Sequence, residues 1–131
     1  MTTILLVDDD PLQASLLLSL LQRRFGDVRR AADAAEALCL IEQPEFAGTL
    51  SLAISGHHTP GIGGPAFVNE LRARMPRLPI LVLGSNGESP TDYAQDRIFF
   101  LARPFANETM LHRTGQILQG QILRGNTDAV A

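Results

Sequence analysis

Short, almost wholly apolar runs alternate with helix-like stretches along this chain, and that alternation restricts the folds open to it. The clearest runs are Ile4–Val7, Leu50–Ser55 and Pro79–Leu83. Each has the length of a strand and is apolar on both faces, which is typical of a strand covered by helices on both sides. The pattern therefore predicts an α/β fold with a parallel, doubly wound sheet. Two weaker strands are predicted at Val28–Ala32 and from Arg97 onward.

The stretches between these runs carry helix signals. Pro11 follows a cluster of Asp residues that can cap free N–H groups, and Gly26 is suited to end the helix that begins there. Asp33 with Glu36 is a second capped start, and Pro65 opens a third helix. The apolar face expected for the first helix consists of Leu12, Leu16, Leu17, Leu20 and Leu21. Only a short helical stub fits before Arg97, and the last helix is expected from Ala106 to Leu123.

Length and composition indicate one domain over residues 1–124 with a flexible tail at 125–131. A net charge of −3 argues against sequence-independent nucleic-acid binding, which needs clustered cations. No apolar run approaches the roughly 18–20 residues of a membrane span. The single Cys39 lies among apolar residues at helical spacing, so we expect it to be buried. A cytoplasmic location is expected.

Four segments carry a more specific signal: ILLVDDDP (Ile4–Pro11), LAISGHHTPGIGG (Leu52–Gly64), LPILVLGS (Leu78–Ser85) and FLARPF (Phe100–Phe105). In kind and spacing they resemble the receiver (CheY-like) domain of response regulators in two-component signalling. The resemblance covers about residues 3–123. It implies a (βα)5 flavodoxin-like fold with strand order 2-1-3-4-5.

The same resemblance locates a phosphorylation site. Asp8 and Asp9 match the acidic pair that holds Mg²⁺ in the family, and the backbone carbonyl of His58 would be a further ligand. The phospho-acceptor position falls on Gly56, in a stretch (46–69) that contains no Asp or Glu. Phosphoryl transfer in this family needs a carboxylate nucleophile, so we expect no acceptor and at most weak, vestigial Mg²⁺ binding.

Positions that the family uses for switching are altered as well. Gly84 stands where the resemblance implies a hydroxyl residue, with Ser85 one place later. Phe100 matches the aromatic switch but has no hydroxyl, and Arg103 replaces the usual lysine. Arg103 is expected to clamp Asp8 or Asp9, since a guanidinium can hold a carboxylate through two hydrogen bonds. Pro104 is a candidate for the cis peptide bond that receivers carry here.

These features favour an atypical, phosphorylation-incompetent receiver that is no enzyme and acts by binding proteins. The surface expected to bind a sensor kinase, an output protein or a second copy is formed by the fourth helix, fifth strand and fifth helix of the family. One alternative is regulation by a metal ion at Asp8, Asp9 and a histidine, or by a small molecule in the pocket. A remote alternative is a D-x-D phosphotransferase built on Asp8 and Asp10, although the chain has no Lys and carries Leu12 where a hydroxyl is needed.

Overall fold

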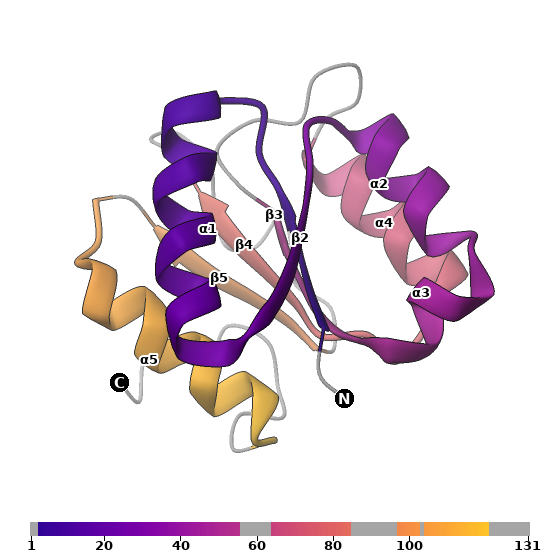
Figure 1. Ribbon diagram of the computed structural model, residues 1–131. Coiled ribbons are helices and arrows are strands. Elements are labelled where there is room, and N and C mark those ends of the chain that lie inside the picture. Colours follow the sequence, from indigo (N-terminus) through magenta and orange to yellow (C-terminus); the bar gives the residue numbers. More distant parts are fainter. Residues whose placement is uncertain (1–2, 56–63, 85–96, 103, 121–131) are drawn as a thin grey trace.

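A five-stranded parallel sheet forms the centre of the protein, with helices on both of its faces (Figure 1). The computed structural model describes residues 3–55, 64–84, 97–102 and 104–120. The strands are β1 (Thr3–Val7), β2 (Asp27–Ala31), β3 (Leu50–Ser55), β4 (Ile80–Gly84) and β5 (Ile98–Ala102). The helices are α1 (Pro11–Phe25), α2 (Ala34–Ile41), α3 (Pro44–Thr49), α4 (Gly64–Arg74) and α5 (Asn107–Leu118).

The strand order is β2-β1-β3-β4-β5, and every neighbouring pair is parallel. The chain therefore starts near the middle of the sheet, extends to one edge through β2, and returns past β1 to build the other edge. Both the predicted fold class and the predicted strand order are confirmed. In such a sheet the carboxyl ends of the strands lie along one edge, where β1 and β3 mark the change of direction and ligands usually bind.

Alternate residues of the strands supply two separate cores. One core packs the sheet against α2 and α4, and it includes Val82, Phe67 and Phe100. The other packs the sheet against α1 and α5, and it includes Leu83, Phe99 and Leu17. Figure 1 shows α1 and α5 together on one face and α2, α3 and α4 on the other. No helix in the described part of the chain has the length and apolar character to cross a membrane.

Helix α1 begins and ends as predicted, but it buries a different face. The Asp10 carboxylate accepts hydrogen bonds from the N–H groups of Leu12 (3.1 Å) and Gln13 (3.4 Å), and Gly26 has a positive φ of 97°. The predicted burial of Leu12 and Leu16 is wrong, because these side chains are 84% and 49% exposed. The buried residues of α1 are Ala14, Leu17 and Leu21. Six leucines between positions 12 and 21 spread over more of the helix surface than the sheet can cover.

Three further differences concern the crossover segments. The short helix α3, between α2 and β3, was not predicted, and Cys39 is exposed on α2, so its expected burial is wrong. Helix α5 ends at Leu118, because Gly120 just beyond its last turn adopts a positive φ of 75°. The expected end of the last helix near Leu123 is therefore wrong. The expected stub of helix before Arg97 and the tail lie outside the described residues.

Candidate functional site

The loop that follows β1 places acidic residues at the carboxyl edge of the sheet. The side chain of Asp8 is fully buried, and its Oδ1 accepts a hydrogen bond of 3.0 Å from the backbone N–H of Asp10. The N–H of Asp8 donates to the carbonyl of Ala31 at the end of β2 (3.1 Å). Asp9 is half-buried and Asp10 is exposed at the start of α1. Asp8 and Asp9 therefore lie at the predicted edge, with Asp8 fixed within the loop.

A cation from β2 also holds this loop. The guanidinium of Arg30 donates two hydrogen bonds to the backbone carbonyl of Asp8, one from Nε (3.2 Å) and one from a terminal nitrogen (2.9 Å). Arg30 was not identified from the sequence. The sequence indicated only that Arg29 and Arg30 lie late in an edge strand. The pairing of Arg30 with Leu6 on β1 shows that the Arg30 side chain reaches the loop after β1.

Replacing Arg30 by methionine should lower the free energy of unfolding by about 1–3 kcal/mol, because a carbonyl in a half-buried loop loses two charge-assisted donors. Methionine retains much of the aliphatic packing of the side chain. Urea denaturation measures the change. The matched control is Arg29→Met: Arg29 is exposed, faces the other side of the sheet and lies 5.5 Å from the centre of the Phe46 ring. Equal losses in the two variants would contradict a specific role for Arg30.

Two of the predicted switch positions are packed directly on each other. Gly84, the last residue of β4, pairs with Ala102, and Phe100 lies two residues earlier on β5, so both positions face the α4 side. A Cβ atom added to Gly84 would overlap Cζ of the Phe100 ring and would lie 2.5 Å from its Cε1. The ring is only 4% exposed. The phenyl group thus occupies the space that any side chain at position 84 would need.

The remaining predicted site residues lie outside the described part of the chain. These are Gly56, His58, Ser85 and Arg103. The expected clamp between Arg103 and the acidic residues therefore stays a prediction. Pro104 is described and exposed, but the peptide bond before it belongs to Arg103, so the expected cis bond also stays a prediction. Strand β3 ends at Ser55, which is buried beside the position of Gly56.

The described residues do not by themselves form a divalent-cation site. Mg²⁺ needs near-octahedral oxygen ligation. Within the described ranges, no three His, Cys, Asp or Glu side chains gather as metal ligands. Near Asp8, one carboxylate oxygen already accepts a backbone N–H and the carbonyl is held by Arg30. The position predicted as the phospho-acceptor is Gly56, which has no carboxylate. Asp8 and Asp9 are thus the described carboxylates at this edge, and the weak, vestigial Mg²⁺ site stays a prediction.

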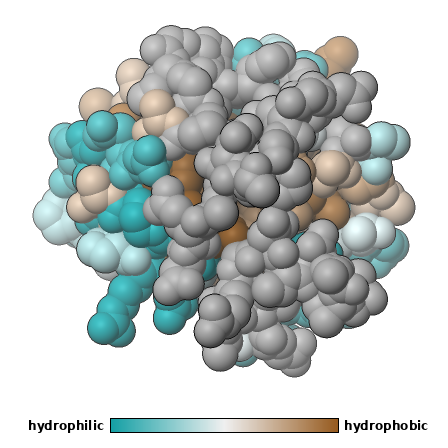
Figure 2. All heavy atoms as spheres, turned by 180° about the vertical axis from the view of Figure 1, so that it is seen from behind, coloured by the Kyte–Doolittle hydropathy of each residue, from teal (hydrophilic) through white to brown (hydrophobic). Residues whose placement is uncertain are grey.

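A concavity lies at the opposite edge of the sheet, where the strands begin. This groove of about 500 Å³ is lined mainly by apolar side chains from α2, from the start of β3 and from the segment joining α4 to β4. Figure 2 shows hydrophilic side chains gathered on the side where α4 lies.

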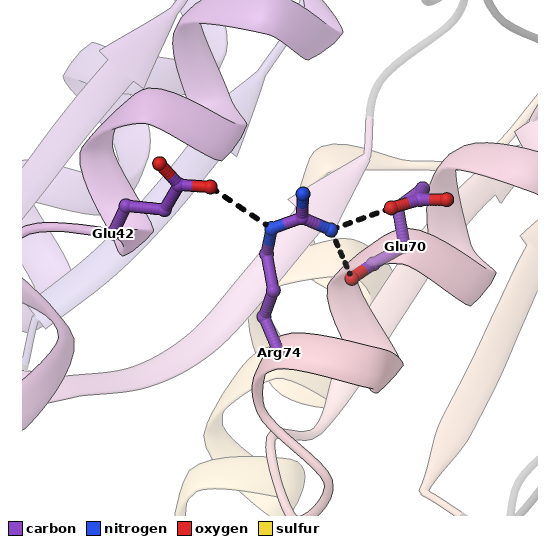
Figure 3. A network of polar contacts seen from close by, with 3 residues as sticks. All are labelled: Glu42, Glu70 and Arg74. Carbon is purple, nitrogen blue, oxygen red and sulfur yellow. Dashed lines mark hydrogen bonds and ion pairs between the residues drawn. The ribbon is translucent and has the colours of Figure 1, made fainter.

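Arg74 borders the groove and hydrogen-bonds to Glu70 (2.5 Å) and Glu42 (3.4 Å) (Figure 3). The bond to Glu70, with a smaller contribution from Glu42, raises the pKa of Arg74. The charge of Arg74 is thus already matched by carboxylates, and Arg77 is the other cation that lines the groove.

Comparisons with known proteins agree with this geometry. Residues 4–114 match the family model described as the response regulator receiver domain. The receiver domain of the hybrid histidine kinase CckA is 34% identical, with a TM-score of 0.71 over 89% of this chain and 99% of that chain. A putative response regulator from Chloroflexus aurantiacus is 31% identical, with a TM-score of 0.76 over 89% of this chain and 97% of that chain. A receiver domain protein from Clostridium thermocellum shares the fold at 17% identity, with a TM-score of 0.79 over 92% and 97% of the two chains. No curated protein matches the chain significantly.

Proposed function

The chain belongs to the response regulator receiver family, and on that premise we propose that it is an atypical receiver that does not accept a phosphoryl group. Glycine at the acceptor position carries this proposal. Gly56 has no side chain, and no Asp or Glu occurs between Phe46 and Asn69. A receiver transfers a phosphoryl group to a carboxylate, which is the nucleophile of the reaction. Shifting the alignment by a few residues does not supply one.

The surroundings of the acceptor position support the same proposal. The Phe100 ring fills the space beside Gly84, so a hydroxyl side chain cannot move there to meet a phosphoryl group. Arg30 holds the loop of the acidic residues through two hydrogen bonds to a backbone carbonyl. Both contacts stabilise one arrangement of the carboxyl edge. We infer that the protein signals from a single conformation, by being bound, and that its output is a contact with another protein.

The proposed docking surface is the face that the family resemblance implies, and within the described part of the chain it includes β5 and α5. A sensor kinase, an output protein or a second copy of the chain is the class of partner proposed, and the cytoplasm is the proposed location. No enzymatic step is part of this function. Asp10 of the alternative D-x-D pair caps α1 through hydrogen bonds to Leu12 and Gln13, so the structure offers a structural role for it.

Phosphorylation gives the direct test. Incubation with acetyl phosphate and Mg²⁺ is expected to leave the intact mass unchanged, and beryllofluoride with Mg²⁺ is expected to leave the backbone amide spectrum unchanged. A receiver with Asp at the acceptor position, treated in parallel, shows that the reagents are active. A stable gain of one phosphoryl group, or saturable shifts near Gly84 and Asp8, would overturn the proposal. If the mass gain of one phosphoryl group disappears in a variant that lacks His57 and His58, the acceptor is a histidine.

A further inference from the structure

The outer face of α1 carries an apolar surface that the fold does not cover. Leu12 and Leu16 are the large hydrophobic side chains that remain exposed in the described part of the chain, at 84% and 49%. They are four residues apart and so lie one above the other on the helix. The segment from Pro11 to Gln22 contains no charged residue. Exposed leucines in an uncharged helix face are typical of a surface that binds another apolar surface.

The two ends of α1 carry opposite charges. Asp9 and Asp10 precede its first turn, and Arg23 and Arg24 lie in its last turn. Arg24 already pairs with Glu108 of α5, at 3.3 Å. Arg23 is exposed, and within the described residues neither it nor Asp9 forms an ion pair. Two copies of this helix placed antiparallel would bring the acidic end of each one beside the basic end of the other.

We propose that α1 is a self-association surface, on which two copies of the chain pack α1 against α1 in antiparallel orientation. Leu16 lies on the two-fold axis and contacts Leu16 of the second copy, because a two-fold interface pairs each residue with its symmetry mate. Leu12 then lies opposite Leu20 of the second copy. Arg23 lies seven positions after Leu16 on the same side of α1, and Asp9 lies seven positions before Leu16 in the loop that leads into the helix. Each Arg23 therefore comes near Asp9 of the second copy.

The expected interface is small. A fifteen-residue helix is about 22 Å long, and one helix face buries less than the roughly 1,200 Å² of a stable complex. The association should therefore be reversible and dependent on protein concentration, and salt should weaken it because its two ion pairs are close to solvent. This inference does not depend on the phosphorylation proposal, since none of its residues is the acceptor.

Sedimentation velocity over a range of protein concentrations tests the apolar contact. The wild-type chain is expected to sediment faster as concentration rises. Leu16→Arg is expected to raise the dissociation constant at least about tenfold, because two arginines would meet on the axis. Leu16 is exposed, so the variant should fold, and circular dichroism checks this. Ala35→Arg, an exposed site on α2, is the matched control and should associate like the wild type. A monomeric wild type, or a Leu16→Arg variant that associates normally, overturns the proposal.

Charge reversal tests the orientation. Arg23→Asp should weaken association, and Asp9→Arg combined with Arg23→Asp should restore it, because the opposite pairs are then exchanged at both ends. Arg77→Asp, at an exposed site after α4, is the matched control and should have no effect. If the double variant associates no better than Arg23→Asp, the antiparallel pairing is wrong.

Cysteine cross-linking gives an independent readout of the axis. In a Cys39→Ser background, Leu16→Cys treated with oxidised glutathione is expected to form a covalent dimer, because residues on a two-fold axis can reach disulfide distance. Ala35→Cys in the same background should form it much more slowly. Equal rates for the two cysteines would overturn the placement of Leu16 at the contact.

Discussion

Replacing Gly84 by alanine is expected to lower the free energy of unfolding by about 1–3 kcal/mol, as is usual when a methyl group is forced into a packed core. The new Cβ would overlap Cζ of Phe100, and the ring is enclosed in the core on the α4 side of the sheet. Threonine, which would supply the hydroxyl of an ordinary receiver, adds two more heavy atoms than alanine. It should therefore lower the free energy of unfolding further. Urea denaturation monitored by circular dichroism measures the loss.

Gly48 is the matched control for this substitution. It lies in α3, and a Cβ added there would meet nothing within 4 Å. Gly48→Ala is therefore expected to leave stability unchanged or raise it by up to about 1 kcal/mol, since alanine favours a helix over glycine. If Gly84→Ala behaves like Gly48→Ala, the ring does not occupy the space that the structure gives it.

A double-mutant cycle identifies the ring as the cause. Phe100→Ala alone should cost about 3–5 kcal/mol, because it leaves a large cavity. Adding Gly84→Ala to that variant should cost much less than Gly84→Ala costs in the wild type, because the atom that it would strike is gone. Changes in the free energy of unfolding are not additive for residues in contact, whereas they usually add for distant residues. Additive losses would mean that Gly84 is sensitive for a reason unrelated to Phe100.

Much of the fold could be predicted because its strands are nearly pure apolar runs. β3 was predicted with the observed bounds, and β1 and β4 to within one residue, since a strand buried on both faces leaves a distinct mark in the sequence. Helix α1 shows the limit of the same reasoning. Its leucines predict a helix, but the choice of buried face depends on Ala14, whose small side chain lets the helix approach the sheet.

The candidate site was predictable only as far as single positions could be matched. Asp8 and Asp9 follow β1 at the carboxyl edge of the sheet, and their role as an acidic pocket stays a prediction. Two contacts that shape the site were not foreseen, because both depend on strand register. Arg30 reaches Asp8 only because β2 pairs with β1 as it does, and Phe100 meets Gly84 only because β5 is in register with β4. Side-chain contacts of this kind depend on the register between neighbouring strands, which cannot be read from the sequence of one strand.

Restoring a carboxylate with Gly56→Asp is expected to be insufficient for switching. The new aspartate would lack a hydroxyl partner at Gly84 and the ammonium partner that Arg103 replaces. Loss of one group that stabilises a transition-state charge commonly slows a reaction about 10²–10³-fold. We therefore expect slow phosphorylation by acetyl phosphate, followed by intact mass, and no change in the environment of Phe100, followed by ¹⁹F-labelled phenylalanine.

The combined variant Gly56→Asp, Gly84→Thr, Arg103→Lys gives the decisive comparison. Threonine at position 84 excludes the Phe100 ring from its present place, so the ring must take another position before phosphorylation. A phosphoryl group that draws the threonine hydroxyl toward it would then reopen that space. The triple variant should therefore phosphorylate faster than Gly56→Asp and shift the Phe100 ¹⁹F signal when it does, although it should be less stable. If Gly56→Asp alone shifts that signal on phosphorylation, the missing acceptor is the sole defect, and the packing of Phe100 on Gly84 does not prevent switching.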